Sequence, residues 1–247
     1  MTSRPEPELS VVVPVKNEAE NILPLLAEIH TALQGKVEFE VVYVDDGSDD
    51  ATPAVLAQAK DIHPRLNVVR HRTSCGQSQA VATGVKHARG SLIGTLDGDG
   101  QNDPADLPAM LDHWRKASDS LRPGLMITGW RANRRDNGIR RLSSKLANGV
   151  RSKLLKDGIP DSGSGIKLLP RALFLDLPRF DHMHRFMAAL VIRAGGTVET
   201  VRVNHRPRER GISKYGVWNR LWVGIVDLIG VMWLIRRARN PVVESLD

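Results

Sequence analysis

Short runs of apolar, β-branched residues alternate along the first half of the chain with stretches whose apolar residues recur every three or four positions. The short runs predict strands, at Leu9–Val15, Phe39–Val44, Leu66–Arg70, Ser91–Leu96 and Gly124–Thr128. The helical spacing predicts helices between them, at Glu18–Leu33, Thr52–Lys60, Gln77–Ala88 and Asp106–Ala117. Strands that alternate with helices build βαβ units. The sequence therefore predicts an α/β fold with a mostly parallel central sheet and flanking helices.

The pattern changes after Thr128, where the basic stretch Arg131–Arg151 predicts a loop followed by a helix over Ile139–Leu155. We expect a strand, a helix, a second strand and a polar loop beyond it, at Ile166–Leu169, Arg185–Ala194, Thr197–Asn204 and Arg206–Tyr215. Val217–Ile235 is the most apolar segment of the chain. These features predict a domain over residues 1–216 and an appended segment over 217–247.

Polar clusters follow three of the predicted strands, at 16–18, 45–48 and 97–101. In mostly parallel sheets ligands bind beyond the carboxyl ends of the strands, so we expect these clusters to share one site. The alternative is purely structural: Pro14 ends its strand, and Asp45 or Asp46 caps the next helix.

Asp97-Gly98-Asp99-Gly100-Gln101 carries the clearest chemistry. Side chains alternate in an extended backbone, so Asp97 and Asp99 point the same way and repel each other unless a cation lies between them. Oxygen ligands suit Mg²⁺ or Mn²⁺, which keep positions for substrate phosphates. The two glycines remove bulk and would let a ligand approach the backbone. The alternative is a solvated acidic turn.

Charge divides the chain of 247 residues into two unequal parts. Residues 1–110 hold 9 Lys/Arg and 16 Asp/Glu, a net charge of −7, whereas residues 111–247 hold 26 and 12, a net charge of +14. The basic part predicts an anionic partner such as a phosphate group, a membrane surface or nucleic acid. The single Cys75 excludes an internal disulfide. We expect neither a signal peptide nor a membrane-spanning helix.

Three ordered motifs carry a resemblance to a known family: Val12–Glu18, Val44–Ser48 and Asp97–Pro104. They resemble the signatures of family 2 inverting glycosyltransferases, which have the Rossmann-like GT-A fold. Later motifs are similar to the dolichyl-phosphate mannose synthase subgroup and its bacterial polyprenyl-phosphate relatives: Gly129–Arg131, Arg140…Ser144…Asn148, Asp161–Gly165 and Arg208…Gly211–Tyr215. The resemblance covers residues 9–216, with departures from the usual residues at Gln77, Gly98, Gly100 and Ser164.

The resemblance implies a role for each motif residue. It implies that a divalent metal, Mg²⁺ or Mn²⁺, is held on the donor diphosphate by Asp97, Asp99 and Gln101. It implies a nucleotide-sugar site built from Pro14, Asn17, Glu18, Asp46, Asp97, Arg208 and Lys214. It implies an acceptor-phosphate site built from Arg131, Arg140 and Ser144. The alternative for the basic residues is a solvated surface helix.

Asp161 is the remaining candidate catalytic residue. A phosphate acceptor is already ionised near pH 7 and needs no strong general base, whereas a sugar hydroxyl acceptor needs one, typically a carboxylate. Asp161 is a candidate for that base, or it orders the turn that contains Gly163 and Gly165.

The C-terminal segment suits a lipid substrate. Tryptophan favours the membrane interface and a basic flank favours the cytoplasmic leaflet; the segment holds Trp218, Trp222, Trp233, Arg236, Arg237 and Arg239. We expect one or two amphipathic interfacial helices, with a buried core helix or a dimer contact as the alternative.

These features together predict a metal-dependent inverting glycosyltransferase that transfers a sugar from a GDP- or UDP-sugar to a polyprenyl phosphate. We expect it to be cytoplasmic and peripheral on the cytoplasmic membrane face, and not to bind nucleic acid. A transferase with a saccharide acceptor, a nucleic-acid-binding module and an inactive membrane scaffold are the alternatives. The sequence leaves open which sugar is transferred, which nucleobase the donor carries and which metal is bound. It also leaves open whether a second copy of the chain or a membrane partner protein is needed.

Overall fold

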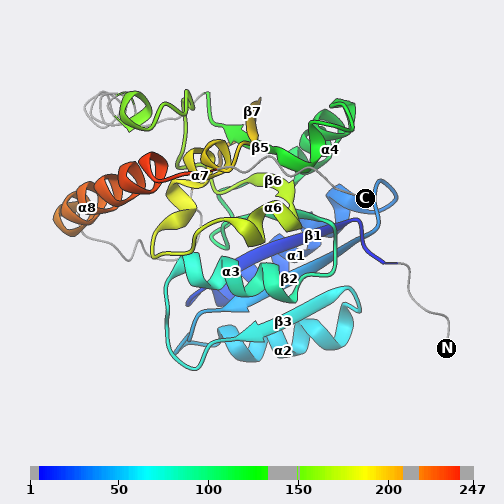
Figure 1. Ribbon diagram of the computed structural model, residues 1–247. Coiled ribbons are helices and arrows are strands. Elements are labelled where there is room, and N and C mark those ends of the chain that lie inside the picture. Colours follow the sequence, from blue (N-terminus) through cyan, green and yellow to red (C-terminus); the bar gives the residue numbers. More distant parts are fainter. Residues whose placement is uncertain (1–5, 133–148, 150, 208–216, 240–247) are drawn as a thin grey trace, which may run out of the picture.

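The computed structural model describes residues 6–132, 149, 151–207 and 217–239, with side chains in the last helix described from residue 224 (Figure 1). One seven-stranded sheet runs through this part of the chain, in the order β3-β2-β1-β4-β6-β5-β7. Its strands are β1 (Leu9–Val15), β2 (Phe39–Asp45), β3 (Leu66–Arg70), β4 (Leu92–Thr95), β5 (Leu125–Trp130), β6 (Lys167–Pro170) and β7 (Thr197–Arg202).

Helices cover both faces of the sheet. One face packs against α1 (Ala19–Leu33), α2 (Thr52–Ile62) and α4 (Leu107–Lys116). The other face packs against α3 (Gln77–His87), α6 (Arg171–Asp176), α7 (Met187–Arg193) and α8 (Val217–Arg236). Short 3-10 helices lie at Pro104–Asp106, Arg122–Gly124 and Met183–Arg185.

Strand β1 shows why the core has two halves. Its side chains alternate between the two faces: Val11 and Val13 lie in the cluster with α1, and Val12 lies in the cluster with α3. All three are fully buried. A strand covered on both faces must be apolar at nearly every position, which is the continuous apolar run seen in the sequence.

Strand β6 is the exception in an otherwise parallel sheet. It pairs antiparallel with β4 on one side and with β5 on the other, and Lys167 stands opposite both Thr95 and Thr128. The pairs β1–β2, β1–β4, β2–β3 and β5–β7 are parallel. The predicted α/β fold with a mostly parallel sheet is therefore confirmed, and a strand from the basic part of the chain lies beside β4.

Element boundaries follow the predictions closely, and the differences have local causes. Helix α7 begins at Met187 instead of Arg185 because residues 183–185 form a 3-10 turn. Helix α6 is a short helix that the sequence pattern did not indicate. Most of the predicted helix Ile139–Leu155 and of the loop Arg206–Tyr215 lies outside the described residues, although 151–155 are helical.

Helix α8 occupies the predicted C-terminal apolar segment as one helix of 20 residues. Among the residues that the structure describes, no helix combines the length and the hydropathy needed to cross a bilayer.

Candidate active site

The loops that follow β1, β2 and β4 meet at one edge of the sheet. Strand β1 lies between β2 and β4 and is parallel to both, so the three carboxyl ends point the same way. The backbone N–H of Asp46 donates to the carbonyl of Val15, at 2.8 Å, and that of Leu96 donates to Val12, at 3.2 Å. The arrangement of the strands thus brings the three predicted polar clusters to one edge.

Asp97 is the partly buried acid of this edge. Burial raises the pKa of its carboxyl, the negative charge of Asp99 raises that pKa further, and the positive charges of Lys167 and Arg131 oppose the rise. The side-chain amide of Gln77 donates to Asp97 Oδ1 at 2.8 Å. The backbone N–H of Asp97 donates to Asn102 Oδ1, also at 2.8 Å, so both the side chain and the backbone of Asp97 are hydrogen-bonded.

Two glycines fix the surroundings of Asp97. A Cβ at Gly165 would overlap the carboxylate of Asp97, so the backbone before β6 approaches that acid as closely as only glycine permits. A Cβ at Gly98 would lie 2.5 Å from Val15 Cγ1 and 2.9 Å from the carbonyl oxygen of Pro14. At Gly98 the expected room for a ligand is therefore occupied by β1.

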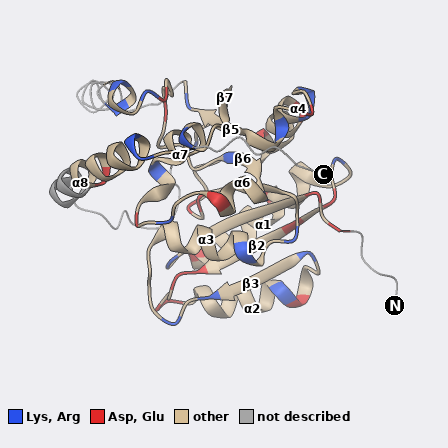
Figure 2. Cartoon of the chain, viewed as in Figure 1, with Lys and Arg blue, Asp and Glu red and all other residues tan. Residues whose placement is uncertain are grey.

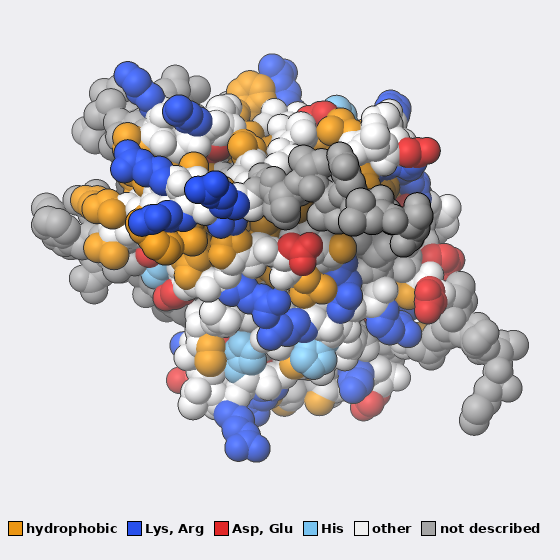
Figure 3. All heavy atoms as spheres, in the orientation of Figure 1, with side chains coloured by type: hydrophobic (Ala, Val, Ile, Leu, Met, Phe, Trp, Pro, Cys, Tyr) orange, Lys and Arg blue, Asp and Glu red, His pale blue; other side chains and the backbone are white. Residues whose placement is uncertain are grey.

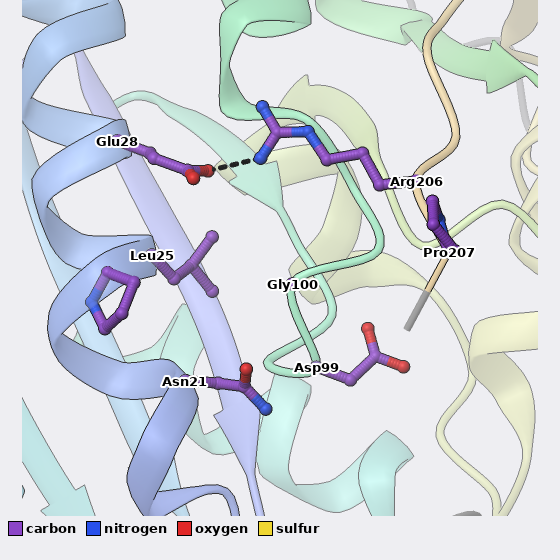
Figure 4. A pocket seen from close by; sticks show the side chains of 8 residues that line it. Asn21, Leu25, Glu28, Asp99, Gly100, Arg206 and Pro207 are labelled. Atoms are coloured by element: carbon purple, nitrogen blue, oxygen red, sulfur yellow. Dashed lines mark hydrogen bonds and ion pairs between the residues drawn. The ribbon is translucent and has the colours of Figure 1, made fainter. Parts of the chain in front are cut away.

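Asp99 and Gln101 form the outer part of the acidic loop. The backbone N–H of Gln101 donates to Asp99 Oδ1 at 3.1 Å, and its side-chain amide donates to the carbonyl of Arg206 at 3.4 Å. A pocket of about 350 Å³ opens beside Asp99, between the loop and α1 (Figure 4).

Arg206 closes one wall of that pocket. Its guanidinium pairs with Glu28 of α1 at 2.7 Å, the dashed contact in Figure 4, and with Asp103 at 2.6 Å. An isolated antiparallel bridge joins Asn102 to His205. The segment after β7 is thereby tied to the acidic loop through both backbone and side chains.

Asp46 is the centre of a second network. Its two carboxylate oxygens accept from the His71 imidazole and the Ser74 hydroxyl, both at 2.7 Å, and from the backbone N–H groups of Cys75 and Gly76, at 2.8 and 2.9 Å. Burial alone would raise the pKa of Asp46, but these four donors lower it below its usual value. Asp46 therefore does not cap α2; it fixes the loop before α3.

The other predicted nucleotide-site residues join the loops after β1 and β2. The backbone N–H of Asn17 donates to Ser48 Oγ at 2.9 Å. The backbone N–H of Glu18 donates to Thr52 Oγ1 at 2.9 Å. Pro14 is the penultimate residue of β1, opposite Val44 of β2. These contacts position the rim of the site.

Arg131 and Asp161 form a bidentate ion pair. Nε of Arg131 donates to Oδ2 of Asp161 at 2.7 Å, and Nη2 donates to Oδ1 at 2.8 Å. Both side chains are more than nine-tenths buried. The sequence predicted both residues for the site but did not predict that they contact each other.

Lys167 is a buried cation that the sequence prediction missed. Burial lowers its pKa to about 8, while the charges of Asp97 and Asp161 raise it and Arg131 lowers it further. Its ammonium donates to the carbonyl of Ser164. The signal was a lone lysine inside the apolar run 166–169, which we interpreted only as a strand.

Buried Ser78 and partly buried His184 form a second pair that the sequence did not indicate. Burial first, and then the charge of Lys167, lower the pKa of His184 to about 3, so its imidazole is neutral. The Ser78 hydroxyl and His184 Nδ1 share a hydrogen bond of 2.7 Å, and the backbone N–H of His184 donates to Ser78 Oγ at 3.2 Å. The pair ties residues 183–185 to the start of α3, next to Gln77.

Four predicted residues lie outside the described part of the chain: Arg140, Ser144, Arg208 and Lys214.

The structure brings the other predicted residues of the acidic and basic motifs together with Lys167: Asp97, Asp99, Gln101, Arg131 and Asp161. Acidic and basic groups are therefore neighbours in this site. Such a site can hold a divalent cation beside one anion and bind a second anion next to it.

Comparison with known proteins agrees with this geometry. The chain is 34% identical over 242 residues to the dodecaprenyl-phosphate galacturonate synthase of Rhizobium johnstonii. The aligned region covers 95% of this chain and 69% of that protein. It is 31% identical to the undecaprenyl-phosphate 4-deoxy-4-formamido-L-arabinose transferase of Edwardsiella ictaluri, over 85% of this chain and 63% of that protein. The chain thus spans about two thirds of the length of these relatives.

A solved structure shares the fold. Glucosyl-3-phosphoglycerate synthase from Mycobacterium tuberculosis, crystallised with Mn²⁺ and UDP, superposes with a TM-score of 0.67 at 17% identity, over 96% of this chain and 81% of that one. Residues 10–177, more than half of the chain, match the family described as Glycosyl transferase family 2. With the fold, the acidic loop and these relatives in agreement, the chain belongs to glycosyl transferase family 2.

Proposed function

We propose that this protein transfers a sugar from a nucleoside diphosphate sugar to a polyprenyl phosphate. An oxygen of the acceptor phosphate attacks the anomeric carbon, the bond from that carbon to the diphosphate breaks, and the nucleoside diphosphate leaves. The names of the relatives in Rhizobium and Edwardsiella, both polyprenyl-phosphate sugar enzymes, support this assignment.

The donor side of the reaction is assigned to the acidic loop. Asp97, Asp99 and Gln101 supply oxygen ligands of the kind that Mg²⁺ and Mn²⁺ prefer. Burial and the negative charge of Asp99 raise the pKa of Asp97, and a divalent cation between the two carboxylates would oppose both effects. A bound divalent ion would act as a Lewis acid for the charge that develops on the leaving diphosphate.

A second set of metal-binding residue types does not fit that role as well. Ligand atoms of Asp46, His71 and Cys75 lie within 4.8 Å of one another. Asp46 already accepts four hydrogen bonds from the protein, and nitrogen and sulfur ligands suit softer metals than Mg²⁺. We assign Asp46, with Pro14, Asn17 and Glu18, to the nucleotide.

The acceptor side is assigned to the cations beside Asp97. Arg131 and Lys167 bring two buried positive charges to the acidic loop, and Arg140 and Ser144 would complete the phosphate site. Both oxygens of Asp161 accept from Arg131, and a carboxylate held this way is a poor proton acceptor. A phosphate nucleophile needs no such base, because it is ionised near pH 7.

The observation that carries the proposal is that the partly buried carboxylate of Asp97 lies close enough to Arg131 and Lys167 to feel both positive charges. It favours a phosphate acceptor over a saccharide hydroxyl, whose candidate base, Asp161, is engaged by Arg131. We propose that α8 attaches the protein peripherally to the cytoplasmic face of the membrane. We also propose that Arg208 and Lys214 bind the donor diphosphate.

A transfer assay tests the proposal. Protein, Mn²⁺ or Mg²⁺ and a short-chain polyprenyl phosphate are incubated with labelled GDP- and UDP-sugars, and label entering the organic phase is counted. We expect transfer from one donor, lost with a chelator and in Asp99→Ala. Transfer to a saccharide but not to the lipid would overturn the acceptor, and a failure to bind any sugar nucleotide would overturn the enzyme assignment.

A further inference from the structure

A second pocket lies away from the acidic loop, between α7, α8 and residues 154–156. Its volume is about 390 Å³. The side chains around it belong to aliphatic or basic residues: Leu154, Leu155, Lys156, Ala189, Ile192, Arg193, Met232, Ile235 and Arg236. None of them is among the residues assigned to the site above.

The walls of the pocket combine two chemistries. Leu155 and Ala189 are buried, and Ile192, Met232 and Ile235 extend the apolar lining. Three cations stand around this lining: Lys156, Arg193 and Arg236. Arg193 is held in place because its Nε donates to the carbonyl of Leu234 at 2.9 Å. An occupant that is aliphatic at one end and anionic at the other matches both parts.

The outer face of α8 extends the apolar surface next to the pocket. Ile225, Val226, Ile229 and Trp233 are 41%, 66%, 62% and 59% exposed. Their spacing places them on one side of the helix, and Arg236, seven residues after Ile229, falls on that side too. Leu228, Val231 and Met232 pack instead against the core cluster that includes α7.

The charged side chains that line the pocket are all basic. Figure 2 shows Lys and Arg on α7 and at the end of α8, and Figure 3 shows basic side chains gathered beside a hydrophobic patch on the same side. Arg237 and Arg239 follow Arg236 and are exposed. A second copy of this chain on the same surface would bring like charges together, so charge complementarity favours an anionic occupant.

We propose that this pocket binds one anionic phospholipid of the bilayer, with its phosphate on Lys156, Arg193 and Arg236 and the start of an acyl chain on the apolar lining. The exposed face of α8 then lies in the acyl layer beside the lipid. The inference rests on the proposed membrane attachment but not on the sugar-transfer chemistry.

Vesicle flotation tests the site through its charge. The double variant Lys156→Gln/Arg236→Gln keeps Arg193, which also holds the backbone of α8. Lys60→Gln/Arg72→Gln is the matched control, because it removes two exposed charges near the opposite edge of the sheet, around α2 and β3. On vesicles containing phosphatidylglycerol we expect roughly tenfold weaker binding for the pocket variant and a much smaller loss for the control.

Native mass spectrometry with short-chain phosphatidylglycerol tests whether the site is a pocket or a diffuse surface. We expect one lipid per chain, lost in the double variant and weakened by Ile192→Gln at the apolar wall. Equal losses in the pocket and control variants, equal binding to neutral phosphatidylcholine, or binding of polyprenyl phosphate without any binding of phosphatidylglycerol would each overturn the proposal.

The two proposals fail separately. Transfer to a short-chain acceptor in the absence of vesicles should be the same for the double variant and the unmodified protein, with circular dichroism confirming that both are folded. Phosphatidylglycerol binding without any sugar transfer would support the lipid pocket and overturn the proposed function. Sugar transfer without phosphatidylglycerol binding would support the proposed function and overturn the lipid pocket.

Discussion

The carboxylate of Asp97 lies directly against the α-carbon of Gly165, so that no side chain fits at position 165. Asp97 lies two residues after the end of β4. Gly165 lies two residues before β6, a strand from the distant basic part of the chain. The antiparallel pairing of β4 with β6 sets this contact. The contact fixes the position of an acid that we assign to the metal.

Gly165→Ala is therefore expected to displace Asp97 and lower transferase activity by roughly 100-fold or more, since a shift of about 1 Å at a reacting group can cost that much. The measurement is kcat/KM at saturating metal, with circular dichroism to confirm the fold. Gly224→Ala on α8 is the control, because nothing lies within 4 Å of the added methyl. Full activity in Gly165→Ala would contradict the assignment of Asp97.

Asp161→Asn separates two roles for the Arg131–Asp161 pair. If Asp161 only orients Arg131 on the acceptor phosphate, the variant raises KM for the acceptor by roughly 10- to 100-fold, the worth of a hydrogen bond to a charged group, and leaves kcat nearly unchanged. A general base would instead lose about 10²–10⁴ in kcat. Steady-state kinetics across pH distinguish the two, and we expect the KM effect.

Asp46 is expected to stabilise the fold as well as the nucleotide site. Its lowered folded pKa means that the stabilisation is complete above its unfolded value of 3.8 and is lost as the pH falls through the folded value. Asp46→Asn should cost about 2–4 kcal/mol at pH 7 and progressively less as the pH falls below 3.8, measured by urea unfolding. Asp61→Asn, at an exposed position on α2, is the control; a loss of equal size there would rule out the network.

Lys167 gives a pH dependence of the same sign at alkaline pH. Its folded pKa of about 8 lies below the unfolded value of 10.5, so between these pH values the unfolded chain binds more protons. The free energy of unfolding should then rise from pH 8 to 10 in the unmodified protein relative to Lys167→Met, by about 2–3 kcal/mol. Urea unfolding of both proteins at several pH values measures the difference, and parallel curves would show that Lys167 is not buried as a charge.

The sequence predicted the fold because its strongest patterns are local. Strands buried on both faces are continuous apolar runs, and β1 and β3 begin and end where those runs do. The acidic loop was also found from local spacing, since Asp97 and Asp99 are two residues apart.

The contacts between distant segments could not be predicted in the same way. The Arg131–Asp161 pair, the approach of Gly165 to Asp97 and the Ser78–His184 pair each depend on the antiparallel insertion of β6 or on the packing of residues 183–185 against α3. No periodicity in the sequence encodes which strands become neighbours. Lys167 was missed because one polar residue in an apolar run fits a strand equally well.

The place of β6 limits how this protein can be taken apart. The acidic first part of the chain contributes β4 and the basic part contributes β5 and β6, and β6 lies between β4 and β5. A cut at the charge boundary near residue 110 would leave β4 paired with β1 but without β6, and would expose Asp97 to water. The donor and acceptor sides are therefore not separable modules, and new specificity would have to come from exchanging loops at the edge of an intact sheet.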